Sequence, residues 1–207
     1  MSGTKSAAVA GSKRKRESSK PERRHTKSKA PPATSEEGDD PQDEIARLES
    51  QVLESRKHYN NIATLLQLSR DPDHENETSI LAAVASCRVF TRLLASGDMV
   101  KGKGTSQSEA LIVSWLKERY REYITVLVDV FMRSEHAPKQ SVALTLLMRL
   151  VKEESKQKDY NWRKTPLSQI VETVLRLPSD DATRDEFADK YFTKFDDIRF
   201  HTFQTIQ

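Results

Sequence analysis

The sequence of 207 residues has little cysteine and glycine, with one and six respectively, and no long uninterrupted apolar run. A single cysteine, Cys87, excludes an internal disulfide and cannot by itself form a zinc site. A transmembrane helix needs about 18 consecutive apolar residues, so we expect no membrane span. The first ten residues also lack the apolar stretch of a secretory signal. These absences indicate an intracellular protein in a reducing compartment.

The N-terminal segment, residues 1–40, has no Leu, Ile, Phe, Trp or Tyr, and Val9 is its only branched aliphatic residue. Such a segment buries too little apolar surface to offset its conformational entropy, which predicts a disordered tail. Residues 1–30 hold ten Lys and Arg against two Glu, a net charge of +8, whereas the whole chain carries +3, which leaves −5 for residues 31–207. The sequence therefore predicts a basic arm attached to a mildly acidic body.

Two basic clusters stand out within this tail, and both are typical of nuclear localisation signals. They consist of Lys13, Arg14, Lys15 and Arg16, and of Arg23 and Arg24. An import receptor is the expected partner, and contact with the phosphates of pre-rRNA, independent of sequence, is a second use that does not exclude the first. The alternative is a solvated charge run that only aids solubility.

From residue 41 onward the apolar spacing is helical. The expected helices span about 41–69, 78–95, 107–134, 138–157, 166–177 and 181–205. Local signals mark several ends: Asp40 caps a helix with Pro41 at its first position, Gly97 ends the second helix, and Ser106 with Glu109 forms a capping box. Long helices joined by short connections predict an all-α fold, either a bundle or helical hairpins stacked as an α-solenoid-like (HEAT/armadillo-like) array. We expect residues 41–207 to form this helical scaffold domain.

The sequence shows no constellation of catalytic or metal-binding residues. Its five histidines are scattered, and residues 101–106 resemble a phosphate-binding loop without the required spacing. Cys87 lies on an apolar helical stretch and is expected to be buried. Trp115, Tyr120 and Tyr123 have core spacing, which is favoured over a platform for stacking bases. We therefore expect no enzyme, no metal, no cofactor and no small-molecule substrate.

Three segments together resemble the N-terminal helical region of the nucleolar complex protein four family, whose members are related to the CCAAT-binding factor. These segments are residues 54–62 (ESRKHYNNI), residues 87–98 (CRVFTRLLASGD) and residues 187–199 (FADKYFTKFDDIR). The resemblance implies a non-catalytic scaffold of the nucleus and nucleolus that acts in small (40S) ribosomal subunit biogenesis and rRNA processing. It also implies nucleolar assembly-factor partners of the small-subunit processome, with pre-rRNA nearby. The rival hypotheses are an RNA-binding protein that uses its tail and the lysines around Lys101 and Lys103, and a helical hydrolase, which would need converging carboxylates or histidines.

The last expected helix carries aromatic residues on more than one face, whereas an amphipathic helix needs one apolar stripe. They are Tyr191, Phe192, Phe195, Phe200 and Phe203, and we take them as a candidate interaction surface, with burial in the core as the alternative. Members of the family continue into a second helical domain, but this chain stops at Gln207. We expect that domain to cover the aromatic residues, and a partner protein is the second candidate.

Overall fold

A computed structural model describes residues 40–71, 75–102, 104–157, 160–162, 166–178 and 181–206. The predictions for residues 1–39 lie outside these residues. Within them the fold is all-α, as expected, and no strand occurs. The elements are α1 (Pro41–Glu54), η1 (Arg56–His58), α2 (Asn61–Arg70), α3 (Asn76–Ser96), α4 (Gln107–Thr125), the π-helical turn η2 (Val126–Phe131), α5 (Ala137–Glu154), α6 (Pro166–Arg176), α7 (Ala182–Phe187), the π-helical turn η4 (Ala188–Phe192) and α8 (Asp196–Ile206).

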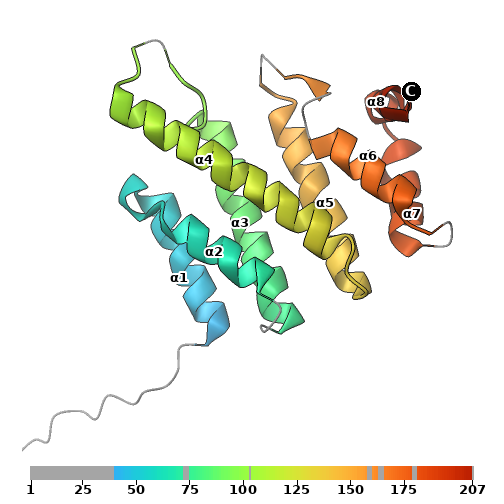
Figure 1. Cartoon of the computed structure of the whole chain (residues 1–207), viewed down its shortest axis with the longest axis horizontal. Coiled ribbons are helices and arrows are strands. Elements are labelled where there is room, and N and C mark those ends of the chain that lie inside the picture. Colours follow the sequence, from blue (N-terminus) through green and yellow to red (C-terminus); the bar gives the residue numbers. More distant parts are fainter. Residues whose placement is uncertain are drawn as a thin grey trace, which may run out of the picture. The chain divides into compact units, whose positions relative to one another are not determined.

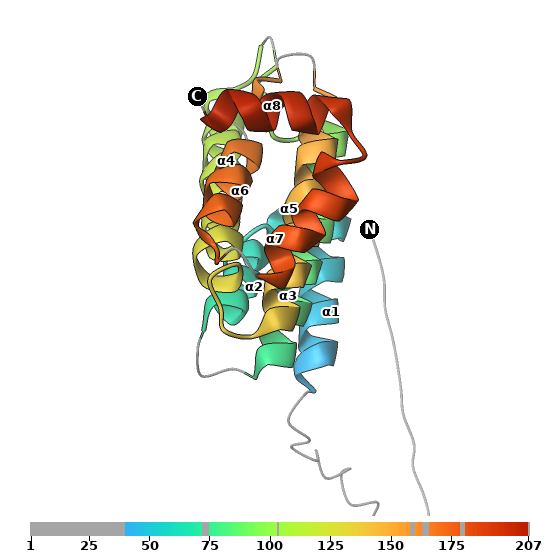
Figure 2. The ribbon, with the colours of Figure 1, turned by 90° about the vertical axis from the view of Figure 1, so that its right-hand side faces the viewer.

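The helices pack as stacked hairpins in two layers. Helices α1, α3, α5 and α7 contact one another in that order, and the second layer runs from α2 through α4 with η2 to α6 and α8. Figures 1 and 2 show these two layers from the front and from the side, with α8 running across the end of the array. The main contacts of each hairpin are with the next one along the chain, which is the packing of an α-solenoid. The predicted fold class is therefore confirmed.

The predicted single helix over 41–69 is wrong, because the helix is interrupted at Ser55. This residue is extended (φ −151°, ψ 139°), and its hydroxyl accepts a hydrogen bond from the Lys57 amide at 3.3 Å. A serine side chain that bonds the backbone locally competes with continuation of a helix. The break lets α1 and α2 pair with each other and lets both pack against α3, which one straight helix could not do.

The signals for the other helix ends are confirmed. Asp40 accepts a hydrogen bond from the Gln42 amide at 3.1 Å, and Ser106 forms the complete capping box with Glu109. Gly97 ends α3 in the left-handed conformation, with φ +77°. A residue without a Cβ adopts this conformation at the lowest cost.

The predicted last helix over 181–205 is also broken. It forms α7, then η4, in which the Thr193 amide donates to the Ala188 carbonyl at 2.9 Å, and then α8. This bond spans five residues instead of four, so the π-helical turn inserts an extra residue and changes the helical register. Two acids, Asp196 and Asp197, then occupy the first turn of α8, where the helix dipole favours negative charge.

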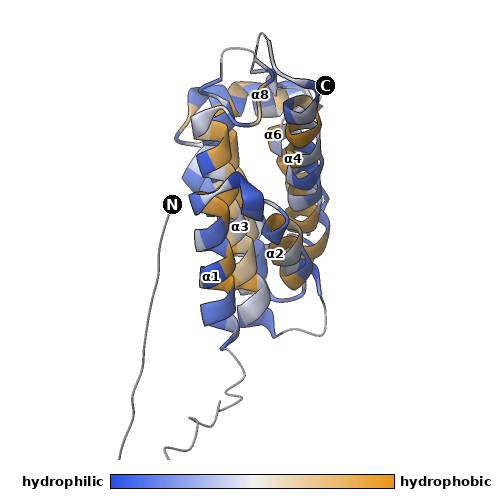
Figure 3. Ribbon diagram, turned by 90° about the vertical axis from the view of Figure 1, so that its left-hand side faces the viewer, coloured by the Kyte–Doolittle hydropathy of each residue, from blue (hydrophilic) through white to orange (hydrophobic). Residues whose placement is uncertain are grey.

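The core lies between the two layers, and Figure 3 shows hydrophobic residues concentrated on the facing sides of the helices. Helix α3 is long and apolar enough to cross a membrane by length and composition. Its contacts with α1, α2 and α5 account for this composition, because ten of its residues are buried in the core. Cys87 is among them, as predicted.

Ion pairs join the first hairpin to the second within each layer. Glu49 of α1 pairs with Arg88 of α3 at 2.8 Å, and Arg70 of α2 pairs with Glu122 of α4 at 2.6 Å. Arg56 of η1 pairs with Asp98, just beyond α3. These pairs are partly exposed, so each contributes at most about 1 kcal/mol to the free energy of unfolding. Their main effect is on the register in which the two hairpins stack.

Candidate interaction surfaces

The six basic residues predicted as a nuclear localisation or RNA-phosphate site lie outside the described residues. They are Lys13, Arg14, Lys15, Arg16, Arg23 and Arg24. The five aromatic residues of the second predicted site are all described. They lie on η4, on α8 and on the short connection between them. We call these five residues the C-terminal aromatic surface.

The last hairpin, formed by α7, η4 and α8, is anchored to the rest of the stack through both of its helices. Asp181 caps α7 by accepting a hydrogen bond from the Thr183 amide at 2.8 Å, and the Thr183 hydroxyl donates to Gln140 of α5 at 3.0 Å. Phe187 and Ile198 are buried in the common core. The elements that carry the aromatic surface are therefore held in a fixed position against α5 and α6.

Three phenylalanines of this surface are largely exposed. The exposed fractions are 50% for Phe195, 58% for Phe200 and 54% for Phe203. Phe200, Phe203 and the exposed Ile206 follow at steps of three along α8, and the ring of Phe192 packs edge-to-face on Phe203 at 5.6 Å. These residues form one apolar stripe, which is unusual for a side of a helix that nothing covers.

Tyr191 and Phe195 lie on a different side of the hairpin. Together with Val151, Trp162 and Ile198 they line a cavity of about 260 Å³ between α5, η4 and α8. Burial raises the pKa of the Tyr191 hydroxyl above its ordinary value. The structure thus places Phe192, Phe200 and Phe203 in the stripe, and Tyr191 with the half-exposed Phe195 in the wall of a small cavity.

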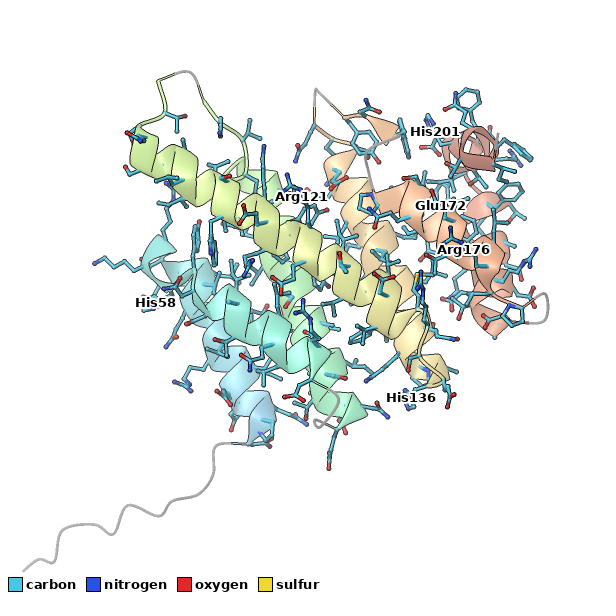
Figure 4. All side chains as sticks on the ribbon, in the orientation of Figure 1. His58, Arg121, His136, Glu172, Arg176 and His201 are labelled. Atoms are coloured by element: carbon cyan, nitrogen blue, oxygen red, sulfur yellow. The ribbon has the colours of Figure 1, made fainter. Side chains whose placement is uncertain are left out.

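His201 connects α8 to the segment that precedes α6. Its ring stacks on Trp162 with centroids 4.0 Å apart and an angle of 14° between the planes, and its Nδ1 lies 3.0 Å from Oε1 of Gln204. Figure 4 labels His201 beside this segment. The contact accounts for this histidine structurally, as part of the packing of α8.

A second hollow, of about 590 Å³, lies where α4 and α6 diverge, and we call it the α4–α6 pocket. Its apolar wall consists of Leu94, Met99, Val100, Ile124 and Pro166. Its charged residues are Lys117, Arg121 and Glu154, and Gln157 and Gln169 are among its amides.

Glu154 is bound to α4 inside this pocket. The Tyr120 hydroxyl donates to Oε1 of Glu154 at 2.6 Å. Burial raises the pKa of the Glu154 carboxyl, although the hydrogen bond from Tyr120 acts in the opposite direction. Burial, together with the nearby Glu154 carboxylate, raises the pKa of the Tyr120 hydroxyl far above its ordinary range. The Tyr120 phenol therefore keeps its proton and remains a hydrogen-bond donor at neutral pH.

Sequence reasoning missed this pocket, because its walls come from four separate helices and their connections. It predicted Trp115, Tyr120 and Tyr123 as core residues; both tyrosines are buried, and Trp115 is half-buried against the core. One signal was available: Lys117 and Arg121 are four residues apart, which places two cations side by side on one face of a helix. The sequence alone did not indicate which elements face them.

The described histidines do not converge. His58 lies in η1, His136 precedes α5 and His201 lies in α8, and Figure 4 shows them on separate parts of the fold. Among the described residues no group of three or more His, Cys, Asp or Glu side chains is placed to hold a metal ion. Burial raises the pKa of the Cys87 thiol, which makes it a poor nucleophile.

Comparison with known proteins identifies a family that matches this chain. Residues 35–207 match the family model described as nucleolar complex protein 4-like, TPR repeats. The chain is also 29% identical over 161 residues to an uncharacterized protein of Schizosaccharomyces pombe, an alignment that covers 75% of this chain and 33% of that protein. The chain thus spans about a third of the length of this relative. No solved structure matches significantly.

Proposed function

The chain belongs to the nucleolar complex protein 4-like family, and we propose from this membership that it is a non-catalytic nucleolar scaffold in 40S ribosomal subunit biogenesis and rRNA processing. The match over residues 35–207 carries the proposal, because it covers every described helix. The stacked hairpins support it, since such arrays present extended, rigid surfaces to other proteins.

We further propose that the C-terminal aromatic surface contacts nucleolar assembly-factor proteins of the small-subunit processome. Aromatic side chains dominate the energy of protein interfaces because they bury a large area at low entropic cost. Phe200 and Phe203 offer such rings on a helix that is anchored to the stack. The continuation that family members carry after this region is the other candidate to cover the stripe.

We also propose two roles for the basic tail, residues 1–40. Its two clusters bind an import receptor, which directs the chain to the nucleus and nucleolus, and they reach pre-rRNA phosphates nearby. The net charge of +8 over residues 1–30 favours a second candidate function, an RNA-binding protein that contacts pre-rRNA through the tail, independently of sequence. The two functions differ in whether partners are retained through protein or through RNA.

The test is affinity purification of the tagged chain from nuclear extract, with and without RNase, followed by mass spectrometry. For the scaffold we expect small-subunit processome proteins to survive RNase and to be lost when Phe200 and Phe203 are both replaced by Ser. The matched control replaces two other exposed apolar residues, Leu53 and Leu111, by Ser and should retain the partners.

A second pair of outcomes separates the two candidate functions. Processome proteins that disappear with RNase would support the RNA-binding function instead. If no ribosome-assembly factor is recovered in any sample, the proposal is wrong for this chain.

A further inference from the structure

The two cations of the α4–α6 pocket have no charged partner among the residues that the structure describes. Lys117 and Arg121 form no ion pair with another described residue, whereas Arg70, Arg88 and Arg119 each pair with a glutamate. Figure 4 shows Arg121 on the side of α4 that faces α5 and α6. Two neighbouring cations on a helix repel each other, so an anion bound between them would relieve this repulsion.

The charge of the pocket is positive overall. Lys117 and Arg121 contribute +2, and Glu154 is its only acid among the described lining residues. Glu154 lies at the α5 side and already accepts the Tyr120 hydroxyl, which leaves further lone pairs on its two oxygens. An incoming anion therefore fits beside α4, while Glu154 can accept a backbone amide from the same ligand.

The apolar wall narrows the choice of ligand. Leu94 and Met99 are buried at its base, while Val100 is 55% exposed at its edge. A volume of about 590 Å³ lies within the usual range for ligand pockets, about 300–1,000 Å³. A nucleic-acid backbone has no apolar side chain for this wall, and its repeated phosphates would meet the carboxylate of Glu154.

We propose that the α4–α6 pocket binds an extended acidic peptide segment, which places one bulky apolar side chain against Leu94, Met99 and Ile124 and an Asp or Glu side chain between Lys117 and Arg121. The amide of the apolar residue donates to Glu154. This site is separate from the C-terminal aromatic surface, so the chain has a second docking point that does not depend on the first.

The experiment measures binding of labelled short peptides to the full chain by fluorescence anisotropy. One pool carries a single Leu, Phe or Met flanked by Asp and Glu. A second pool has Lys in place of the acids, and a third has Ala in place of the apolar residue. We expect the first pool to bind more tightly than the other two, with an affinity that falls as salt is added.

Charge reversal tests the position of the site. The double substitution Lys117→Glu with Arg121→Glu should raise the Kd of the best acidic peptide about tenfold or more, because two attractions become repulsions. The control substitution Lys57→Glu with Arg92→Glu changes the net charge equally at exposed cations outside the pocket and should leave the Kd unchanged. Val100→Asp, at the exposed edge, should also weaken binding, and circular dichroism checks that each variant is folded.

Three results would overturn the proposal. The first is that the pool with both acids and an apolar residue does not bind. The second is that the charge reversal of Lys117 and Arg121 weakens binding no more than the control substitution does. The third is that a single-stranded RNA oligonucleotide, and no peptide, loses affinity on this reversal, which would assign the cations to phosphate.

Discussion

Phe90 provides a sharp test of the packing at the centre of the stack. This side chain on α3 is fully buried, and its ring lies 5.3 Å from the rings of both Tyr120 and Tyr123 on α4. The ring of Tyr123 stacks on it with 23° between the planes. Phe90→Leu removes two aromatic contacts worth about 0.5–1.5 kcal/mol each and leaves a small void that costs about 1 kcal/mol more. We therefore expect a loss of about 2–4 kcal/mol in the free energy of unfolding.

The assay is urea unfolding of the purified chain followed by far-ultraviolet circular dichroism. A loss of this size should also lower the Tm by roughly 5–15 °C for a chain of this length. The matched control is the same substitution at the surface, Phe203→Leu, where the ring is 54% exposed and the expected loss is at most about 1 kcal/mol. Equal losses for the two variants would refute the packing argument, because they would mean that Phe90 is no more enclosed than Phe203.

Three further predictions concern charge and helix ends. Burial raises the pKa of the Glu154 carboxyl above its ordinary value of 4.5, so the folded protein binds the carboxyl proton more tightly than the unfolded chain does. The contribution of Glu154 to the free energy of unfolding therefore decreases as the pH rises from 4.5 through the folded pKa. Glu154→Gln removes the cost of burying the charge and should make unfolding by urea less dependent on pH, with a more favourable effect at pH 7.5 than at pH 5; the reverse order would contradict this reasoning. Ser106→Ala removes the capping hydroxyl of α4 and should cost about 1 kcal/mol in thermal unfolding, whereas Ser114→Ala on the exposed face of the same helix should cost nothing measurable. Gly97→Ala places a Cβ on a residue with φ +77° and should cost about 1–2 kcal/mol, although nothing lies within 4 Å of that Cβ; an unchanged midpoint in urea would show that the strain is absent.

Most of the fold could be predicted because its helix ends depend on local chemistry. Asp40, Gly97 and the pair Ser106 and Glu109 act through hydrogen bonds or dihedral angles within a few residues, so the sequence carries the whole signal. The break at Ser55 was missed because no Pro or Gly marks it and the apolar spacing continues across it. The local bond of the Ser55 hydroxyl only competes with a helix, and the packing of α1 and α2 on α3 adds a tertiary contribution that the sequence does not show.

In the candidate sites, too, the features that depend on local sequence could be predicted and those that depend on tertiary packing could not. The aromatic residues were found from composition, and the sequence indicated that one helical stripe could not accommodate them all. Their division into an exposed stripe and a cavity wall follows from the extra residue in η4, whose π-helical turn no local signal announced. The α4–α6 pocket depends on the divergence of two helices that are distant in sequence, so its lining could not be read from spacing.

The stacking of the hairpins also has a mechanical consequence. Since the main contacts of each hairpin are with the next, a load applied along the row passes through the interfaces in series. In such a series the most compliant interface determines the stiffness of the whole row. A protein that inserts a side chain beside this most compliant interface would therefore stiffen the whole row of described helices without touching the other interfaces.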